Sequence, residues 1–283
     1  MFGSFVAQSA TAMPALTLPP PLTPLPALGA QLTHQGYAVI NAAAVAQLAG
    51  TTLQALADWQ VLWDDLPPDA FLKDGGRYRR RRHGCFIVQP AAVVGSAAAA
   101  AAAGAARPGV QAVPHRAHWQ PVQYNALHGG TLRWFEPLAP QWAASPAWQR
   151  LLLALAAQAA LLCGSGQAAQ PWFVEAHPFR IDTTDGIGRP TPEGAHRDGV
   201  DLVVVILVAR VGIKGGETRV FEAHGPQGLR FTLTEPWSAL LLDDARVIHE
   251  STPIQPHDAA QGGHRDTLVL TFRRGGFQGP DAA

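Results

Sequence analysis

From about residue 170 onward the chain is a succession of short strand-like segments, and this pattern limits the possible folds more than any other feature of the sequence. The segments are rich in β-branched and aromatic residues, and clusters of Gly, Pro and Asp separate them. Short, evenly spaced strands over roughly 110 residues favour a β-sandwich or barrel over repeated βαβ units. The segments are PWFVEAHPFRI, DLVVVILVARV, TRVFEA, LRFTLT, WSALLLDD and DTLVLTFRR.

The rest of the chain divides by composition into terminal tails, a mixed half and an insertion. The Pro- and Ala-rich start lacks a core-forming period and is expected to be flexible. Mixed helical and strand-like sequence then continues to about residue 165, interrupted by a low-complexity alanine run that is expected at the surface. The expected limits are 1–28 for the first tail, 29–275 for a single domain, 91–110 for the insertion, about 170–275 for the strand-rich core and 276–283 for the second tail.

Charge and composition exclude several classes of function. Lys plus Arg and Asp plus Glu each number 21, so no general field attracts nucleic acid or an anionic membrane. Cys85 and Cys163 are too few for a disulfide framework. No Lys or Arg precedes Lys73, and the apolar stretch at 151–163 is too short to span a bilayer. These features predict a cytoplasmic protein without a membrane segment.

The tripeptide His-Arg-Asp occurs twice, at 196–198 and 264–266. A protein-kinase catalytic loop also contains it, but that loop needs an Asn five residues after the Asp, where this chain has Val203 and Thr271. A kinase is therefore excluded, and each copy needs an interpretation of its own.

The first copy has the spacing of a metal site. Residues i and i+2 of a strand project from the same face, so His196 and Asp198 would offer an imidazole and a carboxylate side by side. His249 follows the segment WSALLL and is the candidate third ligand. Two His and one carboxylate on one face of an octahedron form the facial triad of non-haem Fe(II) oxygenases, which leaves other positions open.

The second copy indicates a different chemistry. Arg265 opens a strong strand in which Thr267, Val269 and Thr271 alternate on one face. A guanidinium at the mouth of a barrel binds a carboxylate through two hydrogen bonds, which Lys cannot do. Arg265 would therefore suit a dicarboxylate cosubstrate.

Together these motifs resemble those of the Fe(II)/2-oxoglutarate-dependent dioxygenases, and more closely those of the bacterial family that includes the free L-isoleucine 4-hydroxylase. The resemblance covers roughly residues 31–275. It implies a mostly β fold with flanking helices, whose core is a double-stranded β-helix, the cupin-like jelly roll. The motifs that carry it are PEGAHRDGVD, KGGETRVFE, DDARVIHESTPI and GHRDTLVLTF.

The resemblance also implies the cofactors and the reaction. Fe(II) would be held at the catalytic centre by His196, Asp198 and His249. The cosubstrate 2-oxoglutarate would chelate the iron and pair its distal carboxylate with Arg265, aided by Thr267. With O2, the enzyme would hydroxylate an unactivated C–H bond of a small polar substrate, expected to be a free L-amino acid, and would convert 2-oxoglutarate to succinate and CO2.

Further pocket residues come from the same comparison. One arginine of the run RYRRRRHG, either Arg79 or Arg81, is expected to bind a substrate carboxylate, although the same run is also consistent with a solvated strand. The remaining candidates are Tyr124 and Asn125 for hydrogen bonds to 2-oxoglutarate, and Arg133, Glu136 and His177 for the substrate.

Two alternatives stay open at the level of sequence. The same iron chemistry could act on a peptide or a natural product. A cupin-like jelly roll could also bind a metal or ligand for regulation without turnover, although a full triad together with Arg265 favours catalysis.

Overall fold

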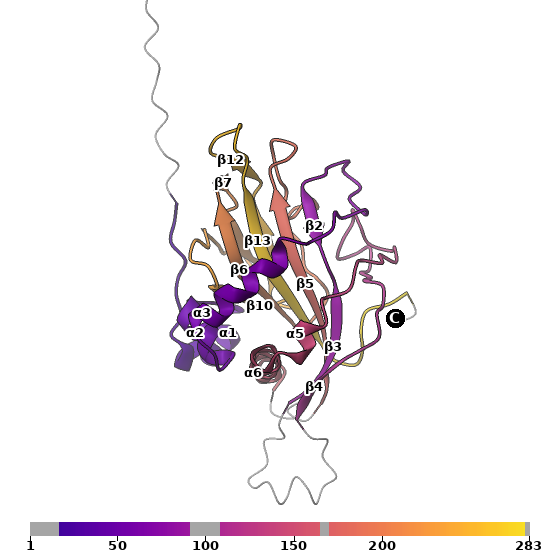
Figure 1. Cartoon of the computed structure of the whole chain (residues 1–283). Helices are drawn as coiled ribbons and strands as arrows, with labels where there is room; N and C mark the ends of the chain where they lie inside the picture. Colours follow the sequence, from indigo (N-terminus) through magenta and orange to yellow (C-terminus); the bar gives the residue numbers. More distant parts are fainter. Residues whose placement is uncertain (1–16, 91–107, 165–169, 281–283) are drawn as a thin grey trace, which may run out of the picture.

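The computed structural model describes residues 17–90, 108–164 and 170–280. Its centre is an eight-stranded antiparallel sheet in the order β1-β10-β6-β13-β5-β3-β4, with β2 also paired to β5 (Figure 1). The long strands at its middle are the apolar segments of the sequence. The strands are β1 (Tyr37–Ile40), β2 (Arg79–Arg81), β3 (Gly84–Gln89), β4 (Gly109–Ala112), β5 (Trp172–Asp182), β6 (Leu202–Val211), β10 (Ala239–Asp243) and β13 (His264–Arg273).

Two smaller sheets complete the β structure. One has the order β11-β8-β9, and β12 pairs with β7 in the other. Apolar side chains of the first, including Val220 and Val247, pack with Val203 and Leu207 of β6, so two sheets enclose a common core. The expected mostly β fold with a double-stranded β-helix core is confirmed. These strands are β7 (Ile213–Gly215), β8 (Thr218–Glu222), β9 (Gly228–Phe231), β11 (Val247–Ser251) and β12 (Ile254–Pro256).

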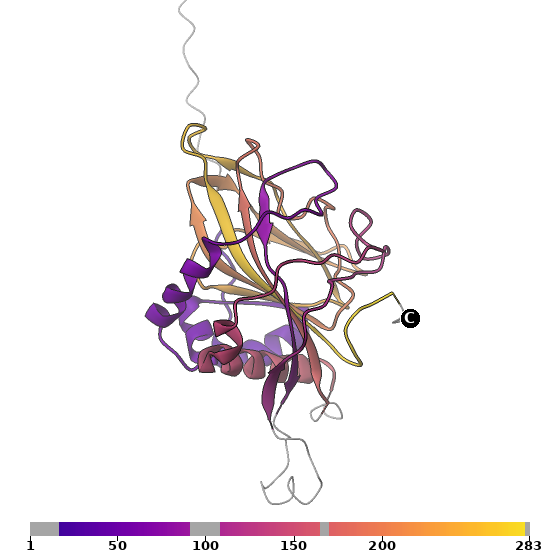
Figure 2. The same cartoon turned by 45° about the vertical axis from the view of Figure 1, so that its right-hand side comes forward.

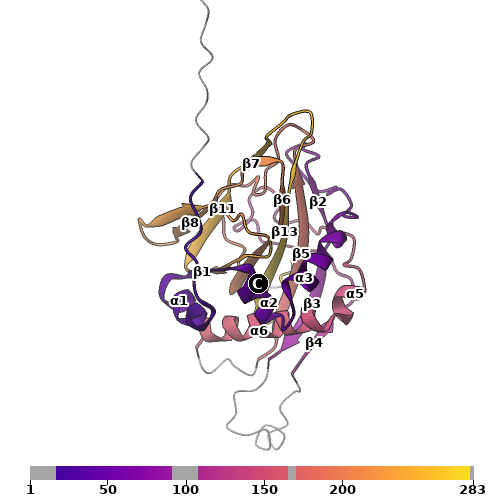
Figure 3. The same cartoon turned by 60° about the vertical axis from the view of Figure 1, so that its left-hand side comes forward.

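Helices from the N-terminal half cover the other face of the large sheet. In Figures 2 and 3, α6 runs across one end of its strands. Ser145 caps α6 by accepting a hydrogen bond from the Trp148 amide, and Pro146 stands in its first turn, as helix starts favour. None of the helices in the described ranges is long and apolar enough to cross a membrane. The helical elements are η1 (Leu25–Ala27), α1 (Leu28–Gln35), α2 (Ala42–Leu48), α3 (Leu53–Ala57), η2 (Asp58–Trp63), α5 (Gln141–Ala144) and α6 (Pro146–Leu162).

Alternation along the central strands separates the core from a cavity. Successive side chains of a strand point to opposite faces. On β13, Leu268 and Leu270 therefore join the core beneath the helices, whereas Arg265, Thr267 and Val269 line a cavity on the opposite face. The side chains of β5 alternate between the core and the cavity in the same way. Those of β2 match them, because β2 pairs with β5 in register. The apolar face thus fixes which polar side chains reach the cavity.

Packing extends further toward both ends than the sequence indicated. The Thr23 amide donates to the Val39 carbonyl at 2.7 Å, and Leu18 accepts from the Thr232 amide. Near the C-terminus, Gln278 is buried and donates to two carbonyls of the loop before β6. The expected tails at 1–28 and 276–283 are therefore partly packed against the domain. Of the predicted insertion at 91–110, residues 91–107 lie outside the described ranges, and its end contributes to β4.

Candidate active site

A cavity of about 130 Å³ contains most of the predicted site residues. It is bounded by the alternating residues of β2, β5 and β13, by β11 and by the loop before β6. Two predicted residues, Tyr124 and Glu136, do not line it. Those that do are Arg79, Arg81, Asn125, Arg133, His177, His196, Asp198, His249, Arg265 and Thr267.

The His-x-Asp pair and the distal His converge as the spacing predicted. His196 and Asp198 lie in the loop before β6, and His249 lies in β11. Reciprocal backbone hydrogen bonds of 3.1 and 3.0 Å join His196 to His249. One potential ligand atom from each of the three residues lies within 4.8 Å of the others. This group of residues 196, 198 and 249 is called the triad here.

The ring orientations of the triad suit a divalent metal. His196 donates from Nδ1 to the Gly194 carbonyl at 2.9 Å, so Nε2 faces Asp198, 3.7 Å away. Burial opposes a charge on this imidazole, but Asp198 and Glu193 outweigh burial and raise the pKa of His196, so binding a metal at Nε2 would displace a proton. Burial, followed by the neighbouring His196, lowers the pKa of His249 to about 3, so its imidazole is neutral. Two imidazoles and a carboxylate, with open positions beside them, fit Fe(II).

Two side chains hold Asp198 in position. The buried carboxylate of Asp244 accepts the backbone amides of Asp198, Gly199 and Val200 at 2.9, 2.7 and 3.1 Å. Gln120 donates from Nε2 to Oδ1 of Asp198 at 3.0 Å. The first contact fixes the backbone of the loop, and the second fixes the direction of the carboxylate.

Arg265 is a buried cation without a counter-ion. Only 4% of the residue is exposed, and its guanidinium makes no hydrogen bond or ion pair with any residue in the described ranges. Burial, together with Arg210, lowers its pKa to about 10, which keeps it charged near neutral pH. A buried charge needs a partner, and with Thr267 beside it on the cavity wall Arg265 fits the distal carboxylate of 2-oxoglutarate.

Arg79 and Arg81 both line the cavity, but other side chains already occupy much of their hydrogen-bonding capacity. Arg79 forms a buried ion pair with Asp69 at 2.6 Å. Arg81 donates to Nδ1 of His177 at 2.6 Å, and its guanidinium lies over the ring of Phe135 at 3.8 Å. Among the described residues, one nitrogen of each guanidinium is buried without a partner, namely Nη2 of Arg79 and Nε of Arg81.

Arg133 differs from these two because its only hydrogen-bond acceptor in the described chain is neutral. It is 3% exposed and donates to Oε1 of Gln120 at 3.0 Å, while its Nε has no partner. Asn125 donates to the same oxygen and accepts the His128 amide, so it braces this loop. The predicted hydrogen bond from Asn125 to 2-oxoglutarate thus competes with these structural contacts.

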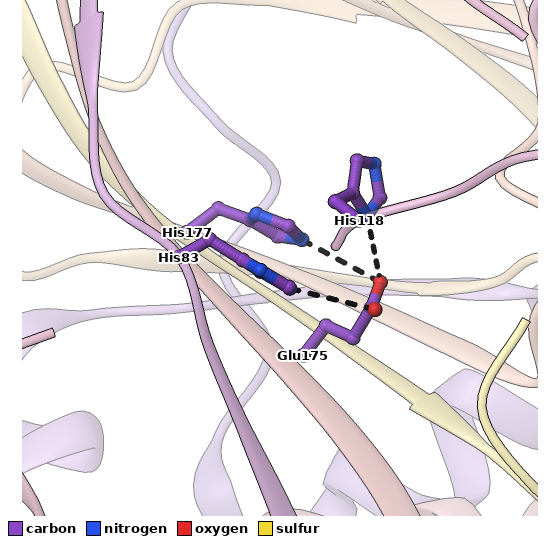
Figure 4. Close-up of side chains that lie close together, drawn as sticks. All are labelled: His83, His118, Glu175 and His177. Carbon is purple, nitrogen blue, oxygen red and sulfur yellow. Dashed lines mark hydrogen bonds and ion pairs between the residues drawn. The ribbon is translucent and has the colours of Figure 1, made fainter. Parts of the chain in front are cut away.

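A second buried cluster of potential ligands lies beside the arginines. It consists of His83, His118, Glu175 and His177, and is called the His–Glu cluster here (Figure 4). Both carboxylate oxygens of Glu175 face the imidazoles, with His118 Nδ1 at 2.9 Å, His83 Nε2 at 3.4 Å and His177 Nε2 at 3.8 Å. By residue type and spacing alone, this cluster could also hold a metal.

Hydrogen-bond chemistry favours a different role for the His–Glu cluster. A guanidinium only donates, so Nδ1 of His177 must accept from Arg81, and the proton of the neutral ring sits on Nε2. That nitrogen therefore has no lone pair for a metal. Burial opposes the charge on Glu175, but His118 and His83 outweigh it and keep the pKa of the carboxyl well below its usual range. The cluster thus fits a hydrogen-bonded hub around an ionised Glu175.

Sequence reasoning misplaced two residues and missed others. Glu136 is exposed because its neighbours Arg133 and Phe135 take the inward positions, and the carboxylate outside the triad that lines the cavity is Glu193. Tyr124 packs outside the cavity, against the Gly199 turn. The histidines at 83, 118 and 128, which were not singled out from the sequence, are buried at or beside the cavity. No local spacing in the sequence marked them, because their partners are distant in the chain.

Comparisons with known proteins agree with this geometry. The sequence model of a family described as 2OG-Fe dioxygenase matches residues 60–271. A solved structure of a bsmA homologue from Methylobium petroleophilum PM1 is 51% identical, with 92% of this chain and 96% of that chain covered and a TM-score of 0.80.

Two more distant structures share the fold. IDO from Bacillus thuringiensis has 15% identity, coverage of 96% of this chain and 100% of that chain, and a TM-score of 0.65. The Fe(II)/(alpha)ketoglutarate-dependent dioxygenase TqaL has 18% identity, coverage of 88% and 87%, and a TM-score of 0.61. The search of curated proteins found no match.

Proposed function

The chain belongs to the 2OG-Fe dioxygenase family, whose members use Fe(II), 2-oxoglutarate and O2, and from this premise we propose that it hydroxylates a free L-amino acid at an unactivated C–H bond. The observation that carries the proposal is the content of one small cavity. It contains the triad, the unpaired Arg265 and three further buried guanidiniums. A small polar substrate with a carboxylate could supply an acceptor for the guanidinium nitrogens that lack one among the described residues.

The two ends of the cavity would have separate tasks. His196, Asp198 and His249 would hold the iron, and Arg265 with Thr267 would bind the distal carboxylate of 2-oxoglutarate. When bound, iron and 2-oxoglutarate supply the oxidising power with O2, and 2-oxoglutarate leaves as succinate and CO2. The buried guanidiniums would orient the substrate, so that one C–H bond faces the triad and water is excluded.

The rigidity of the cavity supports a positioned hydroxylation. Asp244 and Gln120 hold the Asp198 loop, and the His–Glu cluster holds Arg81 through His177. Side chains that are fixed before the substrate arrives lose little entropy on binding. Such a site suits oxidation at one chosen carbon better than a loosely shaped groove would.

The test is a screen of amino acids for oxidation. Purified protein with Fe(II), 2-oxoglutarate and ascorbate is given each member of an L-amino-acid library, and succinate release is measured together with product mass. We expect one or a few amino acids to accelerate succinate release and to gain one oxygen, and His196→Ala to abolish both. Acceleration by peptides but by no free amino acid would contradict the proposed substrate class and favour the peptide alternative.

A further inference from the structure

Glu193 is a largely buried carboxylate on the cavity wall, and its one ionic contact among the described residues is His196. Its side chain is 11% exposed, and Oε2 has no hydrogen-bond partner in the described chain. Oε1 lies 3.5 Å from Nε2 of His196. Nε2 is also the nitrogen of His196 that would bind iron, because Nδ1 donates to the Gly194 carbonyl, so it could not serve Glu193 as well. Oε2 of Glu193 thus faces the cavity without a donor from the described residues.

Glu193 is also set apart from the triad. It is not one of the residues whose ligand atoms gather within 4.8 Å, although it stands only three positions before His196. A buried carboxylate oxygen without a hydrogen-bond donor is costly unless a ligand supplies one. The position thus requires a cation or a strong donor from whatever fills the cavity.

Arg133 is a buried cation that also lacks a partner of opposite charge among the described residues. Arg79 is neutralised by Asp69, and Arg81 is linked through His177 to Glu175, but Arg133 has only the neutral Gln120. Burial lowers the pKa of Arg133 to about 10, and Glu193 is one of the carboxylates that act in the opposite direction. No ion pair joins Arg133 to Glu193 among the described residues, so the two charges face one cavity from separate positions.

We propose that Arg133 and Glu193 form a paired subsite for an α-amino acid zwitterion, in which Arg133 binds the carboxylate and Glu193 binds the ammonium group. This inference rests on the proposed function and narrows it. A zwitterion carries both charges on one carbon and would satisfy both side chains without adding net charge. A dicarboxylate would leave Glu193 unpaired, and an internal peptide residue has neither charge to offer.

The subsite also places the reacting part of the substrate. With the ammonium held by Glu193, next to His196, the α-carbon would lie close to the triad. The side chain of the amino acid would then extend along the remaining wall, which includes the apolar Val205 and Val269. Glu193 would be a specificity-determining residue, because it distinguishes a free amino group from a blocked one.

The test separates the two charges of the ligand. The amino acid identified by the library screen is compared with its des-amino acid and with the amine that lacks its carboxylate. Binding is measured without turnover, by anaerobic titration of the Fe(II)–2-oxoglutarate protein and by thermal shift. The variants are Glu193→Gln, which removes the charge and keeps the shape, and Arg133→Met. The matched control is Glu222→Gln, at an exposed carboxylate.

We expect Glu193→Gln to weaken binding of the amino acid at least about 30-fold, the fold-change for losing one partner of a buried charge pair, and to leave the des-amino acid unaffected. Arg133→Met should weaken both carboxylate-bearing ligands but not the amine. Iron content should match the wild type in each variant. Equal effects of Glu193→Gln on the amino acid and the des-amino acid, or no effect on either, would overturn the proposal.

Failure of the subsite and failure of the function give different results. If amino acids are hydroxylated but bind Glu193→Gln as tightly as the wild type, only the subsite is wrong. If no free amino acid binds or is oxidised by the wild-type protein, both are wrong. Hydroxylation of N-acetylated amino acids at the same rate as free ones would also overturn the role of Glu193.

Discussion

Gln120 donates from Nε2 to Oδ1 of Asp198 at 3.0 Å, and its own carbonyl oxygen accepts from Arg133. One neutral side chain therefore connects the triad to a guanidinium of the substrate end. Removing it frees the carboxylate of Asp198 to rotate and leaves Arg133 without its acceptor.

We therefore expect Gln120→Ala to weaken Fe(II) binding about 10- to 100-fold, the range typical for lost partners of metal ligands. Anaerobic titration with Fe(II) measures this affinity. Gln255→Ala, at an exposed position on β12, is the control and should bind iron as the wild type does. Unchanged iron affinity in Gln120→Ala would show that the hydrogen bond does not orient Asp198.

Asp244 is expected to contribute strongly to stability. It is fully buried, and its carboxylate accepts three consecutive backbone amides of the loop that carries Asp198. Asp244→Ala leaves these donors without a partner, so the free energy of unfolding should fall by about 3 kcal/mol. Urea denaturation of the metal-free protein measures the change, and Asp244→Asn, which keeps one acceptor oxygen, should lose less. A loss below about 1 kcal/mol would contradict this account.

Metal content distinguishes the triad from the His–Glu cluster as the iron site. If the triad holds the iron and the His–Glu cluster is a hydrogen-bonded hub, the protein binds one equivalent of Fe(II). His196→Ala should then lose it, and His118→Gln should keep it. Elemental analysis of the reconstituted and desalted proteins gives the stoichiometry. Two metals per chain, or metal retained by His196→Ala and lost by His118→Gln, would assign the metal to the His–Glu cluster.

His128 makes stability depend on pH. Burial, followed by Arg79, lowers its pKa to about 4, and its Nε2 accepts the Lys73 amide, so the folded protein keeps it neutral. The unfolded chain has the ordinary pKa of about 6.5. Between pH 6.5 and about 4 the unfolded state binds the extra proton, so stability falls as the pH falls through this window. His128→Gln should show a shallower decline in urea midpoints, and an identical decline would contradict the assignment.

The sequence predicted the parts of the site whose partners are close in the chain or follow strand alternation. His196 and Asp198 are two residues apart, and Arg265 and Thr267 share one face of a strand because a period of two places them there. His249 was the candidate third ligand from its place after the strand-like segment WSALLL, and the family resemblance agreed with it. The same alternation would have excluded Glu136, since it has the opposite parity to Arg133 and Phe135, which face inward.

Other features depend on tertiary contacts that no local pattern encodes. His83, His118 and Glu175 come from a strand edge, a loop and a central strand, and they meet only after β3 pairs with β5. Glu193 stands beside the metal motif, but its lack of a partner is visible only once the cavity is built. Isolated polar residues in a sequence look alike whether they are solvated or buried, so burial had to come from the structure.

Arg265 should control cosubstrate binding without affecting the metal. Its guanidinium is buried, charged and without a counter-ion in the described chain, and it lies on a different strand from every triad residue. Arg265→Ala removes one partner of a buried charge pair, so the dissociation constant of 2-oxoglutarate should rise about 100-fold or more, while Fe(II) affinity stays the same. Arg265→Lys should fall between, because an ammonium cannot make the paired hydrogen bonds of a guanidinium.

Both affinities can be followed in one anaerobic experiment, in which Fe(II) is titrated first and the charge-transfer absorption of bound 2-oxoglutarate is recorded next. Arg219→Ala is the matched control, because Arg219 is a half-exposed arginine that pairs with Glu217 and Glu250 on the surface. It should bind both ligands as the wild type does. If Arg265→Ala bound 2-oxoglutarate normally, the distal carboxylate would have another partner, and the neighbouring Arg210, whose Nη1 is buried without a partner, would be the next residue to replace.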